Sequence, residues 1–155
     1  GEYLADSIPI LEWLETRIDA PGLLGDDPGL TMARVHRLDE ALMPAMGGVA
    51  YGTDPARVDR AAGRLADAFT EMAGWLGDHD WLAGRAPTLA EAIATPVYLR
   101  LEGLTELGFD RPIPQGVADH RTRTLASAGG RHVAWSDDQR AEYLGRHRAF
   151  KRRSA

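Results

Sequence analysis

The sequence of 155 residues contains no cysteine. Disulfides, thiolate metal sites and a cysteine nucleophile are therefore excluded within it, and this absence favours a cytoplasmic protein. No stretch approaches the ~20 consecutive apolar residues that span a bilayer. The sequence also does not open with a basic segment followed by an apolar run, as a secretory signal would. Both absences argue against membrane insertion and secretion.

Lysine is nearly absent, and charge is distributed unevenly. Residues 1–110 hold 8 basic and 19 acidic residues, a net charge of −11, whereas residues 111–155 hold 10 basic and 4 acidic residues, a net charge of +6. A basic tail on an acidic body can bind nucleic acid, but here the basic residues lack interleaved aromatic residues for base stacking. We therefore favour a tail that packs against its own acidic body or against a partner subunit.

Several chemistries lack their sequence patterns. None of the five histidines pairs with another at metal-ligand spacing on one helix face with a carboxylate, so no metal site is predicted. They are His36, His79, His120, His132 and His147. No Gly-rich phosphate loop and no Gly-x-Ser-x-Gly nucleophile elbow is present. The sequence therefore predicts no metal and no cofactor.

What is present is helical periodicity, in a composition with 44% apolar residues. Gly1-Glu2-Tyr3-Leu4 has the pattern of a strand remnant without a partner strand, and helices are expected from there onward. Their expected ranges are 6–15, 28 to a break at Tyr51-Gly52-Thr53, 55–76, 88–104, 115–128 and 136–150. We expect Pro44 and Pro96 to distort their helices and Gly129-Gly130 to form a flexible break. The fold class predicted is all-α.

Two capping boxes mark helix starts. In Thr88-Leu89-Ala90-Glu91, the threonine oxygen can accept an orphan amide while the glutamate reaches back to the Thr88 amide. The helix that follows is almost entirely apolar until Arg100, which indicates a central buried helix. Ser136-Asp137-Asp138-Gln139 has the same pattern at the start of the final helix.

Three segments in this order resemble a known family. Asp6-Ser7 followed by Ile8–Leu14 resembles an acidic-Ser element in which a strand passes into a helix. Residues 23–28, with Leu-Leu-Gly and Asp-Pro, resemble an interdomain linker. Residues 81–91 resemble an apolar-Ala-Gly loop followed by the capping box of a central helix. Together they resemble a glutathione S-transferase over residues 1–108, although that family usually has Asp where Glu91 stands.

The resemblance implies a domain organisation. Residues 1–20 are expected to be the end of a thioredoxin-like domain, 21–108 the helical C-terminal-like bundle of the family, and 109–155 a divergent basic extension with a final helix. The family's catalytic Ser, Cys or Tyr and its cis-proline have no counterpart here and would precede Gly1. No catalytic residue is therefore expected in this chain, which would be inactive by itself.

The resemblance also implies two kinds of binding residue. Asp6 would pair with the γ-glutamyl ammonium of glutathione, and Ser7 would hold its carboxylate, although both residues can also act only as a helix N-cap. Met43, Met46, Tyr51 and Tyr98 are expected to line a pocket for the electrophile. For each of these four, ordinary core packing is the alternative.

The function implied is conjugation of glutathione to small hydrophobic electrophiles, a detoxification reaction, in a cytoplasmic homodimer whose contact involves the helices from Pro28 and Pro55. The composition suggests a GC-rich genome, so a related low-molecular-weight thiol is a further possibility. The alternative function is a non-catalytic protein-interaction module built on the same helical domain. No membrane or nucleic-acid partner is expected.

Overall fold

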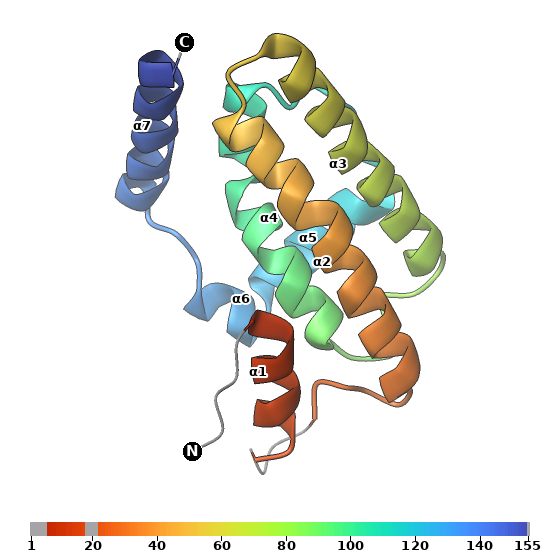
Figure 1. Cartoon of the computed structure of the whole chain (residues 1–155). Helices are drawn as coiled ribbons and strands as arrows, with labels where there is room; N and C mark the ends of the chain where they lie inside the picture. The colour runs from red at the N-terminus through yellow and green to blue at the C-terminus, as the bar shows by residue number, and fades with distance from the viewer. Residues whose placement is uncertain (1–5, 18–21, 155) are drawn as a thin grey trace.

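The computed structural model describes residues 6–17 and 22–154, and these residues form an all-helical fold (Figure 1). The strand expected at residues 1–4 lies outside the described residues. The helices are α1 (Ser7–Glu15), α2 (Pro28–Tyr51), α3 (Pro55–Leu76), α4 (Leu89–Leu107), α5 (Gln115–Ala126), α6 (Ala128–His132) and α7 (Asp137–Ser154). The all-α prediction is confirmed.

Aspartate-proline pairs start α2 and α3, at the residues where the sequence predicted these helices to begin. Asp27 accepts the Leu30 amide at 2.9 Å, and Asp54 accepts the Ala56 amide at 3.0 Å. In both helices the proline that follows costs nothing, because an amide in the first turn has no partner within the helix. α2 stops at Gly52, within the Tyr51-Gly52-Thr53 segment where the sequence predicted a break. A Cβ at Gly52 would lie 2.4 Å from the Gly48 carbonyl oxygen, so only glycine fits this close turn.

α4 is the central helix, as the apolar sequence predicted. It packs against α2, α5 and α7, while α3 covers another face of α2 (Figure 1). Its buried residues form one broad face, while Ala92, Glu102 and Glu106 on the other side are exposed. The buried residues are Leu89, Ala90, Glu91, Ile93, Ala94, Val97, Tyr98, Leu101, Leu104 and Leu107. The helix continues through Pro96 without a break.

The core extends beyond residue 108. Phe109 is 2% exposed and packs edge-on against Phe69 of α3, with ring centroids 5.9 Å apart. Val117 of α5 is fully buried in the same cluster. The region after the proposed boundary therefore contributes to the same hydrophobic core as the helices before it.

The expectation of a flexible break at Gly129-Gly130 was wrong, because both residues lie in α6. A Cβ at Gly130 would lie 2.2 Å from the Thr124 carbonyl oxygen and 2.6 Å from the Leu125 Cα. Gly130 is therefore needed for the close approach of α6 to the end of α5, rather than for flexibility. The Ser127 hydroxyl caps α6 by accepting the Gly130 amide at 3.1 Å.

The second capping box forms as predicted at the start of α7. The Ser136 hydroxyl accepts the Gln139 amide at 3.2 Å, and the Gln139 side chain accepts the Ser136 amide at 2.8 Å.

Near its other end, α7 is attached to the body by Lys151. The Lys151 ammonium donates to the carbonyls of Val49 at 2.9 Å and Leu107 at 2.8 Å. One cation thus binds the C-terminal turns of α2 and α4, where helix dipoles favour positive charge.

The basic region, residues 111–154, packs on the acidic body formed by the residues before it. Four arginines after residue 110 form ion pairs with carboxylates before it. The pairs are Arg111 with Asp59, Arg121 with Glu102, Arg123 with Asp80, and Arg148 with Glu106. Of the helices in the described residues, none is both long and apolar enough to cross a membrane.

Candidate functional site

Asp6 and Ser7, the expected thiol-binding residues, lie exposed at the start of α1. The Asp6 carboxylate caps the helix by accepting the Ser7 amide at 2.7 Å. Asp6 has a φ of 88°, in a region that residues with a Cβ seldom adopt. Such strain persists only where the surroundings impose it, and it is typical of functional sites. The geometry satisfies the capping alternative, and the Ser7 hydroxyl also donates to Oδ1 of Asp6 at 3.5 Å.

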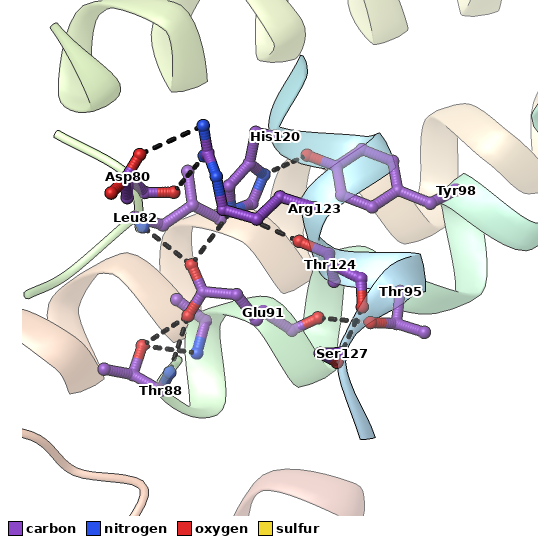
Figure 2. A network of polar contacts seen from close by, with 11 residues as sticks. Asp80, Leu82, Thr88, Glu91, Thr95, Tyr98, His120, Arg123, Thr124 and Ser127 are labelled. Carbon is purple, nitrogen blue, oxygen red and sulfur yellow. Dashed lines mark hydrogen bonds and ion pairs between the residues drawn. The ribbon is translucent and has the colours of Figure 1, made fainter. Parts of the chain in front are cut away.

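The capping box of α4 is part of a buried polar network, which Figure 2 shows. Glu91 is 4% exposed, and its two oxygens accept four hydrogen bonds. The Thr88 amide and hydroxyl donate to Oε2 at 2.6 and 2.9 Å, and the Leu82 amide donates to Oε1 at 2.6 Å. The fourth donor is His120 of α5, whose Nε2 lies 3.1 Å from Oε1. The predicted capping box is confirmed, but its glutamate also holds a loop and a second helix.

The hydrogen bonds continue from His120 to Tyr98. The Tyr98 hydroxyl lies 2.8 Å from Nδ1 of His120, and both side chains are fully buried. We assign the ring proton to Nε2, because the Glu91 carboxylate can only accept. Nδ1 then accepts from the Tyr98 hydroxyl. Every polar atom along this line from Tyr98 to Glu91 has a partner.

Burial and hydrogen bonding shift the pKa of Glu91 in opposite directions. Desolvation, the largest effect, raises the pKa of this carboxyl group, but the hydrogen bonds from His120, Leu82 and Thr88 together outweigh it and hold the pKa below its usual value. For Tyr98, burial and the nearby Glu91 charge both raise the pKa of the phenol. Glu91 is therefore a carboxylate and Tyr98 a neutral phenol at physiological pH. Sealed from solvent, the network fixes the α4 start, the Leu82 loop and α5 relative to one another.

Of the four residues expected to line the electrophile pocket, Tyr51 borders a cavity. This cavity, called the aromatic cavity below, has a volume of about 550 Å³ and lies between α7 and the end of α2. The Tyr51 side chain is 55% exposed. Its ring centroid lies 4.7 Å from that of His147 and 5.5 Å from that of Phe150. Tyr143 extends the aromatic row, with its centroid 4.1 Å from that of His147.

The expectation for Tyr98 needs correction. Its side chain is completely buried and its hydroxyl is bound to His120, so it cannot line an open pocket. Met43 and Met46 are half-buried against the hydrophobic core of α2. Within the described residues the four therefore do not converge on one cavity, because Tyr98 is buried in the core while Tyr51 is exposed.

Some residues of the buried network and of the cavities could not be identified from sequence patterns. His120 was one of five histidines without a recognisable partner, and its bond to Glu91 spans 29 positions. Arg100 stacks on Trp135, with the guanidinium 4.8 Å from the ring centroid, although nothing local links them. Within the described residues there is also no group of three or more His, Cys, Asp or Glu side chains that could hold a metal ion.

Comparison with known protein families, with curated proteins and with solved structures found no match to this chain.

Proposed function

We propose that this chain is the helical part of a glutathione S-transferase-like protein that conjugates glutathione, or a related low-molecular-weight thiol, to small electrophiles. The proposal is carried by the order of three motifs along the helices. The acidic-Ser pair stands at the start of α1, the linker motif precedes α2, and the capping box starts α4. The Leu89 amide also donates to the Leu23 carbonyl at 2.8 Å, which joins the linker to the start of α4.

In the proposed reaction the sulfur of a thiolate attacks an electrophilic carbon, and the leaving group departs with its electron pair. A residue that stabilises the thiolate is needed, because the thiol itself is a poor nucleophile. By the resemblance that residue would precede Gly1. The part assigned to this chain is binding: the Asp6 carboxylate holds an ammonium group, and Ser7 holds a carboxylate at the positive end of the α1 dipole.

The electrophile is proposed to bind in the aromatic cavity of this helical domain. Tyr51, which the sequence analysis expected to line the electrophile pocket, is one of the residues that border it. A cavity of several hundred cubic ångströms suits a small ligand. The proposal includes a cytoplasmic location and a homodimer that involves α2 and α3.

Calorimetric titration tests the thiol-binding role. Glutathione and other low-molecular-weight thiols are titrated into the wild-type chain, Asp6→Asn and Ser7→Ala. Asp26→Asn is the matched control, because Asp26 is an exposed aspartate in the loop before α2. Binding of one thiol that is weakened in both α1 variants and kept in the control is the expected result. Equal, negligible heats for every thiol would contradict the proposal.

A further inference from the structure

A second cavity, with a volume of about 620 Å³, runs along the outer face of α4. α6 and the segment between α6 and α7 form its opposite wall. Apolar and aromatic side chains line most of it, including Trp81, Pro96, Leu99, Val133 and Trp135. Val133 is 44% exposed, a high value for a large apolar side chain, and it lies at this cavity. Pockets of this size and lining are typical of small-molecule sites.

The hydroxyl groups in the wall are turned toward partners inside the protein. Thr88 donates to Glu91 at 2.9 Å, and Thr95 donates to the Glu91 carbonyl at 2.7 Å (Figure 2). Ser127 donates to the Thr124 carbonyl at 2.7 Å. Glu91 also borders the cavity, and its carboxylate already accepts four hydrogen bonds inside the protein. To a ligand the wall is therefore more apolar than its residue types suggest.

Arg100 is the cation at this cavity, and both Arg100 and Trp135 also border the aromatic cavity, the one that Tyr51 lines. Its side chain is half-buried, and one guanidinium nitrogen donates to the Pro96 carbonyl at 2.8 Å. The guanidinium stacks on Trp135, as described above. In the part of the chain that the structure describes, Arg100 forms no ion pair with a carboxylate. Since a guanidinium carries five N–H donors, most of its capacity is left for a ligand.

We propose that this cavity binds a small amphipathic monocarboxylate, with its apolar body between α4 and Trp135 and its carboxylate on Arg100. An apolar wall rewards burial of hydrocarbon, and a half-buried guanidinium that stacks on an indole forms strong charge-assisted hydrogen bonds. An uncharged ligand would leave this charge without a partner. The site is separate from Asp6 and Ser7, so the proposal stands independently of thiol binding.

Octanoate and octan-1-ol test the site, because they share an apolar chain and differ in the charged group. Calorimetric titration of the whole chain is expected to show one saturable octanoate site. Octan-1-ol is expected to bind at least about tenfold more weakly, because it loses a hydrogen bond to a charged group. Arg100→Gln is expected to remove this preference and leave octan-1-ol binding unchanged. Arg153→Gln, which alters an arginine of the aromatic cavity alone, is the matched control and is expected to keep the preference.

A second variant tests whether the ligand binds in this cavity. Ala92 is an exposed α4 residue at the cavity, and Ala92→Phe fills the space, so it is expected to weaken both ligands about tenfold. Ala141→Phe, on the exposed surface of α7, is the control and is expected to change neither affinity. Circular dichroism establishes that each variant is folded. Three results would each overturn the proposal: no saturable octanoate binding, equal affinity for the two ligands in the wild type, or unchanged binding in folded Ala92→Phe.

Discussion

Nε2 of His120 lies 3.1 Å from Oε1 of Glu91, inside the protein and 29 positions away in the sequence. His120 is fully buried and Glu91 is 4% exposed. Through this contact a capping glutamate, which usually serves one helix end, also anchors α5. A buried carboxylate is tolerable here because four donors replace the water it lost.

Glu91→Gln tests how much the buried hydrogen bonds of Glu91 contribute to the free energy of unfolding. The amide nitrogen of glutamine would face a backbone donor or the ring proton of His120, which leaves buried donors unsatisfied. We expect the free energy of unfolding at pH 7 to fall by about 3 kcal/mol, measured by urea denaturation. Glu102→Gln, which removes only an exposed ion pair with Arg121, is the control and is expected to cost less than about 1 kcal/mol. Equal losses in the two variants would show that the buried network contributes little.

The lowered pKa of Glu91 predicts how stability depends on pH. Because the folded-state pKa is below the unfolded value of about 4.3, the unfolded state binds the proton first as the pH falls. The Glu91 contribution is therefore fully present above the unfolded pKa and is lost as the pH falls through the folded pKa. Urea denaturation at a series of pH values should show wild-type stability falling more steeply below about pH 4.3 than that of Glu91→Gln. Parallel curves would contradict the assignment.

Lys151→Met tests the attachment of α7. The methionine keeps an apolar stem but cannot donate to the carbonyls of Val49 and Leu107. Hydrogen bonds from a charged donor contribute roughly 1.5–3 kcal/mol, so the amides of α7 should exchange hydrogen at least about tenfold faster. Arg152→Met changes the exposed neighbour and should leave exchange unaltered. Unchanged protection in Lys151→Met would mean that the other contacts of α7 hold it in place.

The two adjacent glycines of α6 should respond to alanine in opposite ways. At Gly130 the new methyl group would collide with the backbone at the end of α5, and we expect a loss of about 1–3 kcal/mol in unfolding free energy. At Gly129 a Cβ meets nothing within 4 Å. Alanine there should be neutral or stabilise by up to about 1 kcal/mol, because it favours helix. Thermal denaturation of both variants makes the comparison, and a similar effect at both sites would contradict the packing described for Gly130.

The helices were predictable where local chemistry determines them. Asp27-Pro28, Asp54-Pro55 and the Thr88–Glu91 capping box each satisfy orphan amides within one turn, so the sequence alone located these starts. Gly129-Gly130 was misjudged because the need for glycine there comes from another helix. Local sequence cannot distinguish a flexible glycine from one that is tightly packed.

The candidate sites were less predictable, because they depend on contacts between distant segments. Thr88 and Glu91 were expected to pair, but the contribution of His120 depends on how α5 crosses α4. Tyr98 was assigned to a pocket by its position in a sequence pattern, whereas its hydroxyl is used inside the protein. Arg100 and Trp135 meet through the path of the chain between α6 and α7, which periodicity does not specify.

The intact mass of this protein, as its native cell produces it, tests the transferase proposal most directly. If the chain is the helical part of a glutathione S-transferase-like enzyme, the native protein also contains the thioredoxin-like half with the thiol-stabilising residue. Its mass should then exceed that of this chain by on the order of several kilodaltons. A native mass equal to that of the chain would contradict the proposal and favour a non-catalytic interaction module.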